Sequence, residues 1–140
     1  MKNQNMNSSN LPGKNLIFIP SIILLIGAIF NIVVSIPMLI SSAYWDEAWP
    51  IFIPWSIWYS YSIVASLYMI FLSISGIRFC NISEKSAFLH MLSIVMLVLA
   101  TITLMFNVTV LSNAIGLTGL VLPTVYFIGA AKNKQHSQAQ

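Results

Sequence analysis

The sequence predicts an all-α integral membrane protein with four transmembrane helices. Only 6% of the 140 residues are charged, 58% are hydrophobic and the mean hydropathy is +0.86. A soluble domain carries about 25% charged residues, so this chain cannot cover itself with a surface that suits water. The alternating pattern of a membrane barrel is absent, which leaves helices as the spanning elements. These observations exclude a soluble enzyme, a nucleic-acid-binding domain and a disordered chain.

Long uncharged runs place the four spans. An α-helix needs about 20 apolar residues to cross the roughly 30 Å hydrocarbon layer. The uncharged stretches 15–45 and 48–77 hold one span each. The apolar run after Lys85 is too long for one helix, and the polar segment 107–113 divides it into two. The expected spans are therefore 16–40, 51–77, 87–106 and 114–131.

The chain is expected to form one domain between two polar tails. The domain covers 15–131, and the tails 1–14 and 132–140 are polar and lack apolar periodicity. Such tails are typical of disorder. Short connections between consecutive spans predict antiparallel hairpins, two of which make up a compact bundle.

The basic residues predict the orientation of the helices. With four spans, all six basic residues fall on one side of the membrane: Lys2, Lys14, Arg78, Lys85, Lys132 and Lys134. The other side holds Asp46 and Glu47 and no base. Cytoplasmic segments carry the excess of Lys and Arg, so both termini of this multi-pass protein of the cell membrane are expected in the cytoplasm.

Small and polar residues recur on one face of each span. In lipid, helices associate through close contact of small residues and shared hydrogen bonds, so such faces predict a packing seam. The alternative is that these faces line a polar cavity, although no span carries Asp, Glu, Lys or Arg in its middle. The residues assigned to the seam are Gly27, Asn31, Ser62, Ser66, Gly116 and Gly119.

An acidic and aromatic segment lies at the outer end of the first span. All four tryptophans fall within residues 45–58. One interpretation is an aromatic belt at the level of the lipid headgroups. The functional alternative is a recognition lip that attracts a cationic ligand and holds it on tryptophan faces. The residues of this lip are Trp45, Asp46, Glu47 and Trp49.

No catalytic, cofactor or metal site is expected. The chain has two histidines and one cysteine, which are too few for a zinc site, and it lacks the motifs of phosphate loops and hydrolases. His90, about one turn inside a span, is interpreted as a satisfied or snorkelling side chain rather than a proton relay. Cys80 at the inner boundary is a plain interfacial cysteine or, alternatively, an acylation site.

The middle of the chain resembles small, uncharacterised four-helix bacterial membrane proteins. The residues that carry the resemblance are Ser75-Gly76-Ile77-Arg78, Asn81 and Glu84-Lys85-Ser86-Ala87, which lead into an apolar span. The resemblance implies a bundle of four spans with both termini inside. It transfers no functional residue.

The expected function is association rather than catalysis. Without a soluble domain or a catalytic set, the chain is expected to act as an accessory subunit or as a protector against a membrane-active peptide. Its expected partners are the lipid bilayer and either another membrane protein or a cationic peptide, with a homo-oligomer left open and nucleic acid excluded. The alternative function is a small oligomeric transporter or channel.

Overall fold

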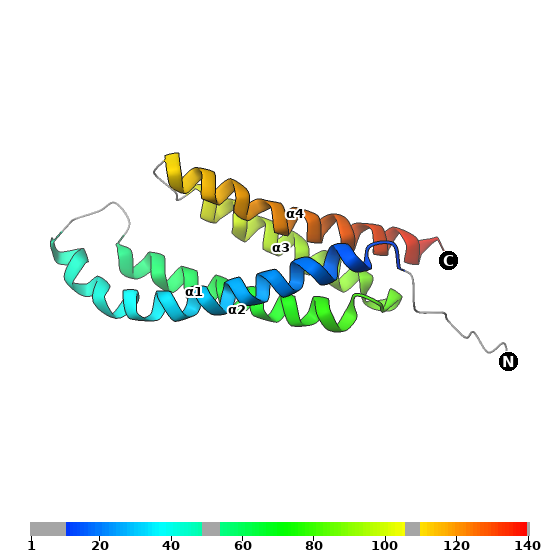
Figure 1. Ribbon diagram of the computed structural model, residues 1–140, viewed down its shortest axis with the longest axis horizontal. Coiled ribbons are helices and arrows are strands. Elements are labelled where there is room, and N and C mark those ends of the chain that lie inside the picture. Colours follow the sequence, from blue (N-terminus) through cyan, green and yellow to red (C-terminus); the bar gives the residue numbers. More distant parts are fainter. Residues whose placement is uncertain (1–10, 49–53, 106–109, 140) are drawn as a thin grey trace.

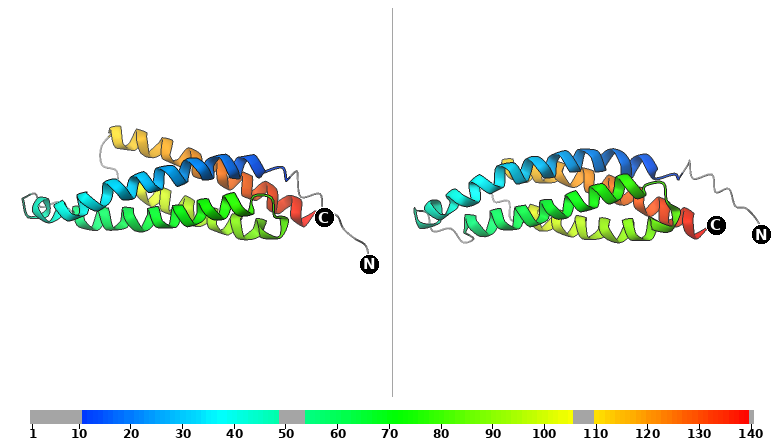
Figure 2. Two further views of the ribbon diagram at one scale, coloured as in Figure 1. Left: turned by 60° about the horizontal axis from the view of Figure 1, so that its bottom comes forward. Right: turned by 90° about the horizontal axis from the view of Figure 1, so that it is seen from below.

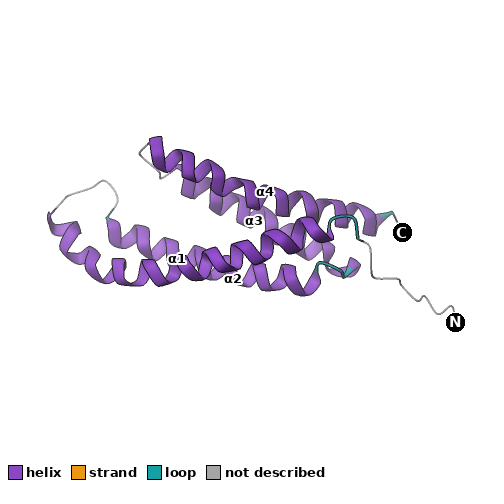
Figure 3. Cartoon of the chain, in the orientation of Figure 1, coloured by secondary structure: helices purple, strands orange, loops and turns teal. Residues whose placement is uncertain are grey.

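The fold consists of four long helices (Figure 3). The computed structural model describes residues 11–48, 54–105 and 110–139, without the side chains of 45–48, 104–105 and 110–119. In these ranges there is no strand, and the all-helical prediction is confirmed. The elements are α1 (Lys14–Ala48), α2 (Trp55–Phe79), the short 3-10 helix η1 (Ser83–Lys85), α3 (Ser86–Met105) and α4 (Val110–Gln138).

Three of these helices are long and apolar enough to cross a membrane. The candidate spans are Lys14–Tyr44, Trp55–Phe79 and Ser83–Thr103, which agree with the first three expected spans to within a few residues. They support a place in the membrane. Membrane crossing by α4 and the direction of the termini stay predictions.

The C-terminal end of α4 corrects the sequence prediction. Residues 132–140 were expected to form a disordered tail, but α4 continues through them to Gln138. The reason is that one side chain of this polar segment, Asn133, is buried and hydrogen-bonded to Gly13 just before α1 and to Cys80 just after α2. Of the expected N-terminal tail, residues 1–10 lie outside the described part, whereas Gly13 is buried against α4.

The helices form two antiparallel pairs (Figure 1, Figure 2). The α1 helix packs along α2, and α3 packs along α4, whereas the consecutive helices α2 and α3 share fewer contacts. The start of α1, the end of α4 and the connection between α2 and α3 lie at one end of the molecule, which we call the terminal end. The α3–α4 pair diverges from the α1–α2 pair toward the opposite end, the distal end (Figure 1).

Small side chains let the helices approach closely in the core. Large apolar side chains instead cover the outside, as in a helix that faces lipid; Phe30, for example, is 69% exposed. Small interfacial side chains permit the short backbone separations on which membrane helices depend. The buried apolar cluster comprises Ile17, Leu72, Cys80, Leu89, Met96, Tyr126 and Ala130, and the buried serines are Ser21, Ser35, Ser42, Ser66, Ser73, Ser75, Ser86 and Ser93.

Candidate functional site

Three helices meet at Gly76 near the terminal end. A Cβ atom added to Gly76 would overlap Ser21 Oγ of α1 and lie 2.9 Å from the Tyr126 hydroxyl of α4. Real Cβ atoms essentially never approach other heavy atoms this closely. Only hydrogen therefore fits at this position without a shift of the neighbours. We call the contact of Ser21, Gly76 and Tyr126 the junction.

Asn133 ties the start of α1 to the ends of α2 and α4. Its Oδ1 accepts a hydrogen bond of 2.7 Å from the backbone N–H of Gly13, and its Nδ2 donates one of 3.3 Å to the carbonyl of Cys80. Beside it, a Cβ on Gly129 would lie 2.8 Å from Leu16 Cβ. The side chain of Asn133 thus satisfies two backbone groups where the chain leaves or enters a helix.

Two buried hydroxyls close to the terminal end lack a hydrogen bond. Ser73 and Tyr126 are fully buried, and neither hydroxyl has a partner among the described residues. A buried polar group left in this state costs about 1–3 kcal/mol. His90 Nδ1 is also buried without a partner, and its ring lies 5.0 Å from that of Phe127. The described ranges contain no group of His, Cys, Asp or Glu that could hold a metal ion.

A second polar cluster joins α1 to α2 in the middle of the molecule. Asn31 Oδ1 accepts hydrogen bonds from Ser35 Oγ at 2.9 Å and from Ser62 Oγ at 2.8 Å. One turn further along α2, Ser66 is buried, with 6% of its surface exposed. The structure therefore brings two residues assigned to the seam, Asn31 and Ser62, to the contact between α1 and α2, and it buries a third, Ser66.

Gly27 does not take part in this contact. Its surface is exposed, and a Cβ added to it would meet nothing within 4 Å. Its assignment to the seam between helices of one chain is therefore corrected, since no described helix of the chain packs against it. Gly116 and Gly119 are helical residues of α4, but their surroundings lie outside the described part.

Tyrosines that sequence analysis did not assign to the seam connect α2 with α3. The hydroxyl of Tyr61 donates a hydrogen bond of 3.0 Å to the carbonyl of Leu99, and that of Tyr68 donates one of 2.7 Å to the carbonyl of Leu92. The two tyrosines are seven residues apart, which places them on one helical face. That spacing is the signal that could have identified them from the sequence.

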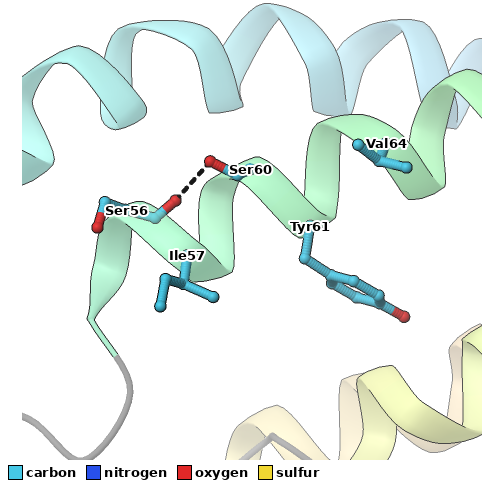
Figure 4. Close-up of a pocket in the computed structure, with 5 residues that line it drawn as sticks. All are labelled: Ser56, Ile57, Ser60, Tyr61 and Val64. Carbon is cyan, nitrogen blue, oxygen red and sulfur yellow. Dashed lines mark hydrogen bonds between the residues drawn. The ribbon is translucent and has the colours of Figure 1, made fainter.

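The distal part of α2 borders an open hollow of about 460 Å³ (Figure 4). Tyr61 points from α2 toward α3, and Ser60 Oγ donates a hydrogen bond of 2.7 Å to the carbonyl of Ser56. Aromatic rings continue beside the hollow, with Trp58 and Tyr61 centroids 5.9 Å apart. The hollow is lined by Ser56, Ile57, Ser60, Tyr61 and Val64.

The acidic part of the expected recognition lip belongs to the distal end of α1. Trp45, Asp46 and Glu47 continue α1 as a helix to Ala48, but their side chains lie outside the described part. Trp49 lies outside the described residues altogether. The start of α2 that carries Trp55 is at the same end of the molecule (Figure 1).

The chain was compared with known proteins by sequence and by structure. Neither the protein-family models, nor the curated proteins, nor the solved structures give a match to the chain.

Proposed function

We propose that the chain is a multi-pass protein of the cell membrane that acts by association with a partner at its distal end. The terminal end carries the basic residues of the described ranges: Lys14, Arg78, Lys85, Lys132 and Lys134. Because basic segments stay in the cytoplasm, this distribution supports cytoplasmic termini and a distal end on the outer side.

The observation that carries the proposal is the absence of charge from the described interior. The buried polar residues there are serines and Asn133, with no Asp, Glu, Lys or Arg among them. Several of these serines donate to a carbonyl of their own helix, as Ser21 does to Ile17 at 2.7 Å. Proton and ion pathways usually need an ionisable group within the membrane. Such an interior supports helix packing and association rather than transport.

The chemistry of the distal end favours a cationic partner. Two of the three acidic residues of the chain, Asp46 and Glu47, are adjacent at the end of α1, and no basic residue occurs between Lys14 and Arg78. An exposed acidic pair attracts cations over about 8 Å in physiological salt. The aromatic start of α2 adds rings that bind apolar and cationic groups. A cationic membrane-active peptide or a basic segment of another membrane protein has this chemistry.

The test is binding of a cationic amphipathic peptide to the protein in lipid nanodiscs. The double variant Asp46→Asn with Glu47→Gln keeps the side-chain sizes and removes both charges. We expect its affinity to fall by about tenfold at low salt, and added salt should weaken binding to the wild type more than to the variant. Glu84→Gln removes the acidic charge of the terminal end and is the matched control. Equal peptide binding by the double variant and the wild type would overturn the proposal.

A small oligomeric transporter or channel is the second candidate. The hollow beside α2 favours it, because polar Ser56 and Ser60 line that space together with Tyr61. Solute flux through vesicles containing the purified protein distinguishes the two functions. Flux above that of empty vesicles would favour transport, whereas tight vesicles together with peptide binding favour association.

A further inference from the structure

An amide side chain lies in the middle of α1, where a membrane has no water to hydrate it. The candidate span of this helix is Lys14–Tyr44, and Asn31 is two residues past its midpoint. At 1.5 Å per residue, the residue is about 3 Å from the centre of the span. Hydrocarbon offers no hydrogen-bond partner at that depth, so an unsatisfied polar group there is strongly unfavourable.

The contacts inside the chain satisfy one end of this amide. Ser35 and Ser62 both bond to the oxygen of Asn31, while no hydrogen bond of its nitrogen is formed within the described part of the chain. The residue as a whole is exposed. Exchanging the oxygen and nitrogen of the amide would not change the conclusion, because the serine hydroxyls would then leave the oxygen without a partner. Either way, one end of the amide of this exposed residue has no hydrogen-bond partner within the described part of the chain.

The neighbouring residues on α1 leave room for a second helix beside this amide. Gly27 lies one turn before Asn31, is exposed and has open space where a side chain would stand. Phe30 and Val34 flank it and are 69% and 42% exposed. A glycine between large side chains forms a notch into which a helix packs closely. We call Gly27, Phe30, Asn31 and Val34 the α1 face.

We propose that the α1 face binds the α1 face of a second copy of this chain. In a dimer with its two-fold axis along the membrane normal, equivalent residues of the two chains lie at the same depth. The two Asn31 amides then meet at mid-membrane, where the Nδ2 of each donates to the Oδ1 of the other. The Ser35 hydroxyl frees the acceptor site for this bond by turning from Asn31 Oδ1 to Ser62 Oγ, which lies 3.4 Å away. A lipid acyl chain offers no such group, and another protein satisfies the amide only with a polar residue at that depth. This interface is separate from the distal end and does not depend on the proposed function.

Gly27→Leu tests the interface without disturbing the single chain. The added side chain has open space within the protomer and fills the notch that the second copy needs. The matched control is Val33→Phe, which adds bulk about 120° around the helix, at a residue that is 63% exposed. In lipid vesicles, the protomers per particle are counted by single-molecule photobleaching over a range of dilutions. We expect wild type and Val33→Phe to dimerise, and Gly27→Leu to dimerise at least about tenfold more weakly.

Disulfide trapping provides a second measurement that leaves packing intact. In a Cys80→Ser background, Gly27→Cys should form a covalent dimer of twice 15.6 kDa on mild oxidation, whereas Val33→Cys should remain largely monomeric. A monomeric wild type in vesicles would overturn the proposal. So would a dimer that tolerates Gly27→Leu, equal trapping at both positions, or trapping of Gly27→Cys to a different protein.

Discussion

Tyr126 is the largest fully buried side chain of the junction, and its hydroxyl contributes nothing by hydrogen bonding. The Tyr126 hydroxyl has no partner in the described part of the chain, whereas the Tyr68 hydroxyl donates a hydrogen bond of 2.7 Å to the carbonyl of Leu92. Tyrosines on neighbouring helices thus differ in whether the hydroxyl is paired. The comparison separates the value of a hydrogen bond from that of ring packing.

Replacing each tyrosine with phenylalanine should have opposite effects on stability. Tyr126→Phe removes an unsatisfied polar atom, so the free energy of unfolding should stay equal or rise by about 1 kcal/mol. Tyr68→Phe leaves the Leu92 carbonyl without this donor and should lower it by about 1 kcal/mol. Unfolding in mild detergent measures both variants. A loss for Tyr126→Phe as large as for Tyr68→Phe would show that the Tyr126 hydroxyl has a partner, such as a bound water.

Cys80 should react slowly with alkylating reagents in the folded protein. The thiol is 3% exposed, and burial raises its pKa because the thiolate loses hydration, while the positive charge of Lys14 partly opposes that shift. A raised pKa leaves less thiolate at a given pH, and the thiolate is the reactive form.

Maleimide labelling between pH 7 and 9 checks this expectation. Labelling of Cys80 should be at least about tenfold slower than after unfolding, and its rate should still be rising at pH 9. Ile82→Cys in a Cys80→Ser background is the control, since Ile82 is 40% exposed. Equal rates for Cys80 and the Ile82→Cys thiol would refute the buried state. They would also show that the Cys80 thiol is accessible enough for acylation.

At the scale of elements, Asn133 in the C-terminal turns of α4 fixes the start of α1, and we call its two hydrogen bonds the clasp. Asn133 bonds to Gly13 before α1 and to Cys80 after α2, so two chain segments are fixed by one side chain. Asn133→Ala leaves a buried N–H and a buried carbonyl without this partner. We expect a loss of about 1–3 kcal/mol in the free energy of unfolding.

The effect of Asn133→Ala is measured by thermal unfolding and by protease cleavage near the start of α1, which should accelerate. Gln135→Ala, at an exposed position on the same helix, should leave both unchanged. An Asn133→Ala variant as stable as Gln135→Ala would contradict the role of the clasp.

The limits of sequence-based prediction follow from the same elements. Apolar runs place the first three spans closely, because the thickness of the bilayer sets helix length. The polar segment 132–138 gives no such signal, since a single buried side chain, Asn133, holds it in place. Periodicity likewise assigned Gly27 and Asn31 to one seam. The spacing of the residues cannot predict that α2 contacts Asn31 but not Gly27.

At the scale of the whole molecule, the described ends of the helices predict the membrane topology. The terminal end holds the start of α1, the end of α4 and five described basic residues. A reporter active only in the cytoplasm should therefore give a signal when fused after Gln140 and none when fused after Ser42. A signal at Ser42 with silence at the C-terminus would reverse the orientation. Silence at both fusion points would mean that α4 does not cross.

Because close contacts are concentrated at the terminal end, the free energy of local opening is higher there than at the distal end. The junction and Asn133 engage α1, α2 and α4 together, so loosening any one of these helices there disrupts the other two. Away from that end the α3–α4 pair diverges from the α1–α2 pair (Figure 1), where the long side chain of Tyr61 still bonds to the Leu99 carbonyl of α3. Local opening free energies follow contact density. The distal turns can therefore open and close repeatedly while the contacts at the terminal end hold α1, α2 and α4 together.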